Sequence, residues 1–234
     1  MSVSEVRKQL RALAEPDRAA FLQGYFKTRE RFLGARVPAI RKLARQYRSL
    51  SLANTGLLLR SPIHEERLLA LLILVDAYER GTPEGREKIF RLYLKHTRYI
   101  NNWDLVDTSA SAIVGVHLTK RSRALLDVLA ESTDIWERRI AIIATHHFIK
   151  RGEFADAVRV ATSLLDDEHD LIHKATGWTL REMGKRDRAA LHAFLDAHAA
   201  HMPRTMLRYA IERLPAALQR RYRNRTPDKK PLHE

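Results

Sequence analysis

The stretch 134-DIWERRIAIIATHHF-148 carries the signals of an amphipathic helix. Asp134 is a residue type that caps helix N-termini, because its carboxylate accepts a hydrogen bond from a free backbone N–H group of the first turn. Gly152 follows the apolar run, and glycine is common where helices end. These signals predict a helix over 134–151.

Similar signals recur along the whole chain. Asp187 is a second candidate N-cap, prolines fall near several first turns, and Gly81 and Gly184 follow periodic segments, as terminal glycines do. Nine glycines in 234 residues are few for a protein of strands and turns, and strand-like alternation of useful length is absent. The chain is therefore predicted to be all-α, with further helices over 3–14, 16–29, 37–48, 51–60, 64–80, 83–97, 102–118, 121–131, 153–166, 169–184, 187–201, 203–213 and 215–223.

The predicted helices form pairs that repeat. Helices that begin near 64, 102, 134 and 169 are each followed by a second helix that begins about 17 to 20 residues later, and the period of roughly 32 to 38 residues is near that of HEAT and armadillo repeats. One pair cannot bury its apolar face alone, so neighbouring pairs must stack. We expect a single curved α-solenoid domain over 1–223 with a basic concave face, followed by a basic, flexible tail over 224–234.

The charge balance indicates an anionic partner. The 42 Lys and Arg outnumber the 28 Asp and Glu, which gives a formal net charge of +14 and a pI near 10.3. Such an excess attracts phosphate, so nucleic acid is favoured over a merely solvated basic surface. The chain has no cysteine, which excludes disulfides, thiolate metal sites and cysteine nucleophiles. The first 18 residues lack a signal peptide, and the longest apolar run, 68–75, is too short to cross a bilayer, so we expect a cytosolic protein without a membrane partner.

Four side chains share one register of the predicted repeats. Trp103 and Asp107 lie four residues apart and therefore share a helix face. Arg139 stands 36 residues after Trp103, and Trp178 stands 39 residues after Arg139, so each lies about one repeat further along. Equivalent positions of stacked repeats project onto the same surface. Each residue also has an ordinary structural interpretation, since tryptophan is usually part of a core and an Asp–Arg pair is often a surface ion pair.

Such a cluster suits a cationic ligand. Aromatic faces attract cations with about 0.5 to 2 kcal/mol, and a carboxylate stabilises positive charge that develops during a reaction. Surrounding arginines and lysines would hold phosphates without reading base sequence. A DNA base alkylated on a ring nitrogen is a cation embedded in a polyanion, and it fits this combination.

The sequence resembles the AlkD family of HEAT-like-repeat DNA glycosylases, the DNA alkylation repair family. The resemblance covers about five-sixths of the chain, in the family's order. The matching stretches are 31-RFLGARVPAIRKLARQY-47, 64-HEERLLALLIL-74, 102-NWDLVDTSA-110, 135-IWERRIAII-143, 169-HDLIHKATGWTLREMGK-185 and 204-RTMLRYAIERLP-215.

The resemblance implies hydrolytic excision of N3- and N7-alkylated purines from double-stranded DNA, without base flipping and without a cofactor or metal. Its catalytic aspartate falls on Asp107, its active-site tryptophans on Trp103 and Trp178, and its active-site arginine on Arg139. Further DNA contacts would come from Tyr25, Arg36, Arg41, Lys42, Arg138, Arg181, Arg204 and Arg208. For Arg204 and Arg208 a simple solvated face is an equal alternative.

Two other functions stay open at this point. A non-catalytic HEAT-repeat scaffold would bind duplex DNA without releasing bases, and a protein-binding solenoid would need an acidic partner. The pairs His169 and His173, and His198 and His201, have spacings that can bind zinc on a helix, but no third ligand is placed and no H-E-x-x-H motif is present. We expect a monomer in the bacterial cytosol, associated with the nucleoid.

Overall fold

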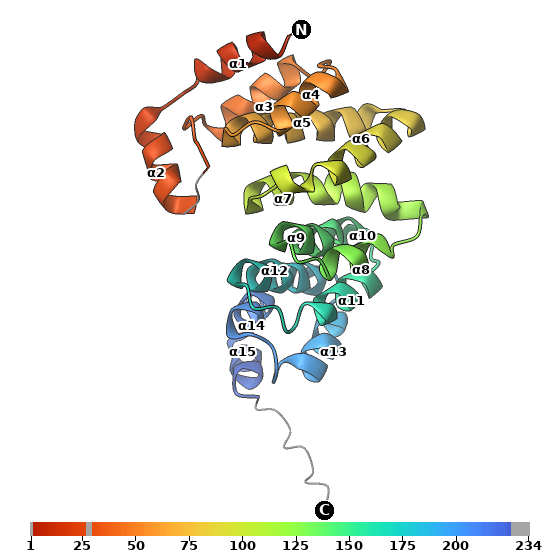
Figure 1. Ribbon diagram of the computed structural model, residues 1–234. Coiled ribbons are helices and arrows are strands. Elements are labelled where there is room, and N and C mark those ends of the chain that lie inside the picture. Colours follow the sequence, from red (N-terminus) through yellow and green to blue (C-terminus); the bar gives the residue numbers. More distant parts are fainter. Residues whose placement is uncertain (1, 27–29, 226–234) are drawn as a thin grey trace, which may run out of the picture. The chain divides into compact units, whose positions relative to one another are not determined.

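The computed structural model describes residues 2–26 and 30–225, and within them the chain is all-α (Figure 1). These residues contain no β-strand, only one isolated bridge between Arg31 and Ile63. The chain divides into two compact units, Met1–His117 and Leu118–Glu234, which are described separately below. Residues 226–234, most of the predicted tail, lie outside the described part, and the single-domain assignment over 1–223 stays a prediction.

The first unit is built around one helix that is buried on nearly all sides. Helix α5 packs against helices before and after it in the sequence, and every residue from His64 to Leu74 is buried. A helix that is apolar all round is expected inside a core. The helices of this unit are α1 (Val3–Arg11), α2 (Pro16–Phe26), α3 (Val37–Gln46), α4 (Leu52–Leu59), α5 (His64–Arg80), α6 (Pro83–Lys95) and α7 (Trp103–Ala110), with a short η1 (Thr97–Tyr99) and a π-helical turn η2 (Ser111–Gly115).

The second unit is organised around α12 (Asp170–Arg186), which packs against α9, α10, α11, α13 and α14. Gly177 permits the close approach of α14, because a Cβ atom on Gly177 would lie 2.4 Å from the Met206 carbonyl oxygen and 2.6 Å from the Tyr209 Cβ. The other helices are η3 (Leu118–Lys120), α8 (Leu125–Ala130), α9 (Ile135–Ala144), α10 (His146–Lys150), α11 (Ala155–Ser163), α13 (Arg188–His198), α14 (Arg204–Ile211) and α15 (Ala216–Arg223).

Most of the predicted helix signals are confirmed. The Asp134 carboxylate accepts from the Trp136 N–H at 2.8 Å, and the Asp187 carboxylate accepts from the Ala190 N–H at 2.9 Å. The helices predicted to begin the repeats do begin at His64, Trp103, Ile135 and Asp170. The all-α, solenoid-like class is thus confirmed, while the curvature and the basic concave face stay predictions. No helix in the described residues combines the length and the apolar character needed to cross a membrane.

Three boundaries differ from the prediction. The helix expected over 134–151 is interrupted at Thr145, whose hydroxyl donates to the Ile142 carbonyl at 2.6 Å and competes with the helical bond. The helix expected over 102–118 changes to π-helical geometry at Ser111. Gly184 does not end its helix, which continues to Arg186; the missing side chain instead makes room for Leu191, whose Cδ2 would lie 2.3 Å from a Cβ there.

Candidate active site

A cavity of about 600 Å³ opens in the first unit between α2, α3, the first turns of α5 and α7. Much of its wall is aromatic, and charged side chains of both signs complete it. The aromatic lining residues are Phe21, Tyr25, Phe26, Phe32 and Trp103; the acidic ones are Glu65, Asp104 and Asp107; the basic ones are Arg18, Arg41 and His64. A concave apolar surface with a few converging polar groups has the character of a binding site.

Trp103 and Asp107 both line this cavity from α7. Their spacing of one helical turn places them on the same face, as predicted, and both side chains are half-buried. The Trp103 ring stacks on Phe26 of α2, with ring centroids 5.6 Å apart and an interplanar angle of 25°. Burial raises the pKa of the Tyr93 phenol, and the negative charge of nearby Asp107 adds to this rise. Asp107 is therefore close enough to the core for its charge to be felt there.

Helix α2 contributes an exposed aromatic rim. Phe21 and Tyr25 are 65% and 59% exposed, and their rings stack with centroids 6.0 Å apart. Tyr25 also meets Phe26 edge-to-face at 5.2 Å. Large aromatic side chains left in solvent next to a cavity are typical of an interaction surface. The structure therefore brings Tyr25 and Arg41, two of the predicted DNA contacts, to the same cavity as Trp103 and Asp107.

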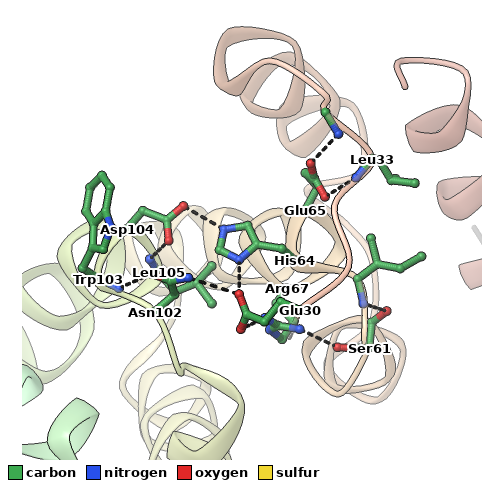
Figure 2. Close-up of polar contacts among 12 residues, drawn as sticks. Glu30, Leu33, Ser61, His64, Glu65, Arg67, Asn102, Trp103, Asp104 and Leu105 are labelled. Atoms are coloured by element: carbon green, nitrogen blue, oxygen red, sulfur yellow. Dashed lines mark hydrogen bonds and ion pairs between the residues drawn. The ribbon is translucent and has the colours of Figure 1, made fainter. Parts of the chain in front are cut away.

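Beneath the cavity, α5 begins with four consecutive charged residues that are all buried: His64, Glu65, Glu66 and Arg67 are at most 3% exposed. The Glu65 carboxylate accepts from the backbone N–H groups of Leu33 and Gly34 at 2.9 and 2.8 Å. Arg67 pairs with Glu30 and donates to the Ser61 carbonyl at 2.9 Å. Figure 2 shows these contacts, which tie the segment 30–34 to α5.

His64 lies at the centre of this network, in contact with two carboxylates (Figure 2). Its Nδ1–H donates to Glu30 Oε2 at 3.0 Å and its Nε2–H donates to Asp104 Oδ2 at 2.8 Å. Burial alone would lower the pKa of His64, but the hydrogen bonds to Asp104 and Glu30 outweigh it and raise the pKa to about 9. The imidazole is therefore a cation at neutral pH.

The sequence analysis did not identify this network. It used the stretch 64-HEERLLALLIL-74 only as part of a resemblance. The available signal was the position of four charged residues directly before a continuous apolar run, because such a helix is buried and its charges then need partners. The partners themselves lie 34 and 40 residues away from His64 and have no local signature.

In the second unit, Arg139 and Trp178 lie on neighbouring helices, α9 and α12. Arg139 is only 5% exposed, and its Nη1 donates to the Leu171 carbonyl at 2.6 Å. Trp178 is half-buried, and its Nε1–H donates to Glu182 at 3.0 Å. The register that groups these two residues with Trp103 and Asp107 stays a prediction.

The Trp178 ring packs against a buried histidine. His146 meets it edge-to-face, with centroids 4.6 Å apart at 75°. The Nε2 atom of His146 is hydrogen-bonded to the Thr179 hydroxyl at 2.8 Å. Burial lowers the pKa of His146 to about 4, and the positive charges of Lys150 and Arg139 act in the same direction, against an opposing effect of Glu182. This imidazole is neutral at physiological pH.

The other predicted DNA contacts differ in how far they are engaged within the protein. Arg36 forms a two-point ion pair with Glu15 at 2.8 and 2.9 Å, although its side chain is 63% exposed. Three more are bonded within the second unit: Arg138 to Asp167, Arg181 to Glu212, and Arg204 to the Arg223 carbonyl. Arg41, Lys42 and Arg208 are exposed. Of these residues, Arg204 and Arg208 line one cavity of about 270 Å³ together with Arg223. Their assignment to DNA stays a prediction.

The histidine spacings noted in the sequence serve other purposes here. His169 caps α12, its Nδ1 accepting from the Leu171 N–H at 3.1 Å, and His173 donates to the Asp167 carbonyl. Across residues 2–26 and 30–225, no group of three or more His, Asp or Glu side chains has an arrangement that would hold a metal ion.

Comparison with known proteins identifies the family. A family model described as DNA alkylation repair enzyme matches residues 6–214. Among solved structures, the chain is similar to a predicted DNA alkylation repair enzyme from Enterococcus faecalis, with a TM-score of 0.70, 16% identity, and coverage of 87% of this chain and 97% of that one. At that identity the similarity supports the fold alone. None of the curated proteins matches the chain. Because the family model covers nearly the whole sequence, the chain belongs to the family of DNA alkylation repair enzymes.

Proposed function

We propose that the protein is a DNA glycosylase that releases N3- and N7-alkylated purines from duplex DNA by hydrolysing the N-glycosidic bond. It acts as a monomer in the cytosol, near the nucleoid, and needs neither cofactor nor metal. The lesion stays stacked in the duplex and is approached from the backbone side. Its family membership supplies the setting, which is enzymatic repair of alkylated DNA.

One observation carries the proposal: Asp107 and Trp103 line an aromatic cavity in a chain whose net charge is +14. A carboxylate repels DNA and weakens binding unless it meets a positive charge. Three carboxylates line this cavity, and two of them, Glu65 and Asp104, accept hydrogen bonds from backbone N–H groups and His64. Asp107 is the carboxylate that we assign to the substrate.

The chemistry follows from the charge of the substrate. A purine alkylated at N3 or N7 carries a positive charge and leaves as a neutral base, taking the electron pair of the C1′–N bond with it. Positive charge then develops on the sugar, and the Asp107 carboxylate stabilises it. Water forms the new C1′–O bond, and its proton passes to solvent or to Asp107. The departing base needs no general acid, since it is already activated by its own charge.

The remaining residues would place the DNA. The face of Trp103 contacts the deoxyribose and attracts its developing charge, at a gain of about 0.5 to 2 kcal/mol. Trp178 would contact the backbone from the second unit, and Arg139 would hold a flanking phosphate by a charge-assisted hydrogen bond. Arg41 and Lys42 on α3 and the exposed Tyr25 would extend this contact along the duplex.

The test is release of 7-methylguanine and 3-methyladenine from methylated duplex DNA. We expect release well above the spontaneous rate from the wild type, and a rate about 100- to 1,000-fold lower from Asp107→Asn, as when an electrostatic stabiliser is removed. Asp76→Asn is the matched control, because Asp76 pairs with Arg80 on α5 and is not part of the cavity wall. Equal rates from wild type and Asp107→Asn would remove Asp107 from the mechanism.

A second candidate function is a non-catalytic scaffold that binds nucleic acid. The cavity formed by Arg204, Arg208 and Arg223 and the net charge of +14 favour it. It predicts duplex binding that weakens steeply with salt, no release of bases, and equal affinity for alkylated and unmodified DNA. Absence of base release from the wild type, together with such binding, would decide for the scaffold.

A further inference from the structure

The buried charges that open α5 connect several parts of the first unit. Glu66 accepts from Arg7 of α1 at 2.9 Å, Glu65 holds the backbone of Leu33 and Gly34, and Arg67 pairs with Glu30. Burying charges costs free energy that only close partners offset. The first turn of α5 therefore acts as a connection point, and its residues gain their stability from fixing other segments.

His64 differs from its three neighbours because its two bonds join opposite walls of the cavity. Glu30 belongs to the segment that leads into Phe32, and Asp104 belongs to the first turn of α7. The imidazole is packed between aromatic rings, with Phe26 and Phe32 centroids at 5.3 and 4.8 Å. His64 itself lines the cavity.

The bond to Asp104 controls the helix that carries the proposed chemistry. Asp104 follows Trp103 directly and precedes Asp107 by three residues, so all three lie within about one turn of α7. The other Asp104 oxygen accepts from the Leu105 N–H at 2.9 Å, which fixes the carboxylate against the helix backbone. Rotation of α7 about its axis would break the His64–Asp104 bond.

We propose that His64 is a positioning residue: by bridging Glu30 and Asp104 it fixes the orientation of α7, and with it the placement of Trp103 and Asp107 in the cavity. This inference rests on the proposed glycosylase function.

The charges around His64 are consistent with this role. Glu30 faces it from the segment before α3, Asp104 faces it from α7, and Arg67 on its own helix shares Glu30. Phe26 and Phe32 cover the ring and contribute no charge. Both ring nitrogens donate, so the bridge requires the doubly protonated imidazole, in agreement with the raised pKa of His64.

Two substitutions separate the halves of the bridge. The side-chain amide of Gln reaches the place of Nε2, so His64→Gln retains a donor to Asp104. The shorter amide of Asn reaches the place of Nδ1, so His64→Asn retains a donor to Glu30 and loses the link to α7. In His64→Gln, Glu30 still has Arg67 and Asn102 as partners. Asp104→Asn breaks the same link from α7 and decides the matter if a His64 variant does not fold.

The experiment measures single-turnover release of 7-methylguanine at saturating enzyme, together with thermal unfolding and duplex affinity. We expect His64→Asn and Asp104→Asn to lower the release rate at least about tenfold, because the catalytic groups are misplaced, with little change in affinity. His64→Gln should retain most of the rate. The control is His117→Gln: His117 is also buried in the first unit, bonded to Tyr78 at 2.9 Å, and lies outside the cavity wall, so it should change unfolding but not release.

The outcomes separate the two proposals. A wild type that releases no base overturns the proposed function, and this inference with it. An active wild type with unchanged release in folded His64→Asn or Asp104→Asn overturns the inference alone. A loss in His64→Gln as large as in His64→Asn, in proportion to the loss of thermal stability, reduces His64 to a stabilising residue and also overturns it.

Discussion

The two units each bury a histidine close to one of the two tryptophans assigned to the site, and the two histidines carry opposite charge states. His64 touches Asp104, the neighbour of Trp103, and lies between two carboxylates. His146 packs edge-to-face against Trp178 and bonds to the neutral Thr179 hydroxyl near several cations. The pKa is raised to about 9 in the first case and lowered to about 4 in the second.

This difference shows how one side chain at similar burial can serve two kinds of surroundings. Desolvation alone disfavours the charged imidazole, and only hydrogen-bonded carboxylates reverse that preference. The carboxylates gather in the first unit, where we place the cationic reaction. Arg139 and Lys150 gather around His146 in the second unit, where we place the backbone contacts. The two environments thus correspond to the two charges of alkylated DNA.

The largest effect on stability is expected on the alkaline side, from His64. Its pKa is higher in the folded state than the ordinary 6.5, so its contribution is fully present below about pH 6.5 and is lost as the pH rises through about 9. The expected loss is up to about 3 kcal/mol. Urea unfolding of the wild type and His64→Gln across this range checks it. A wild type no more sensitive than the variant would mean that His64 is neutral, and the contrast with His146 would disappear.

An effect of similar size is expected on the acid side, from His146. Its folded pKa of about 4 lies below the ordinary 6.5, so the unfolded chain binds the proton first and stability falls as the pH drops from about 6.5 to 4. Again up to about 3 kcal/mol is at stake. His146→Gln keeps a hydrogen-bonding group for Thr179 and should flatten the acid side while leaving the alkaline side unchanged. The reverse pattern would assign the two charge states wrongly.

A smaller effect, about 0.5 to 2 kcal/mol, should separate the tryptophans in function. Trp103→Leu is expected to slow release of cationic bases with little change in affinity for unmodified duplex, because its ring lies in the cavity with Asp107. Trp178→Leu should weaken binding to any duplex, because we place it on the backbone. Release rates and affinities of both variants, measured on alkylated and plain duplex, make the comparison. Identical profiles would show that the two tryptophans share one role.

The sequence was informative where signals are local. Periodicity and the Asp134 cap located helices, and a spacing of four residues was enough to place Trp103 and Asp107 on one face and, as it proves, on one cavity. Long-range partners could not be found in this way. His64 bonds to residues 34 and 40 positions away, and no local pattern tells whether a histidine before an apolar run will be charged.

Glycines illustrate the same limit. Gly152 adopts φ of +78° after its helix, in agreement with a terminal position. Gly184 has the same sequence context but lies inside α12, because the approach of Leu191 demands the small residue there. Gly177 likewise admits the Met206 backbone. A glycine chosen for packing and a glycine chosen for a turn look alike until the neighbouring helix is known.

The most direct test of a carboxylate that stabilises positive charge is binding to a charged mimic of the reacting sugar. Two duplexes would carry, at one position, either a protonated pyrrolidine or a neutral tetrahydrofuran in place of the deoxyribose. We expect the wild type to bind the pyrrolidine duplex at least about tenfold more tightly, in the manner of transition-state analogues, and Asp107→Asn to lose this preference while binding the neutral duplex as the wild type does. A preference of equal size in both proteins would contradict the assignment of Asp107.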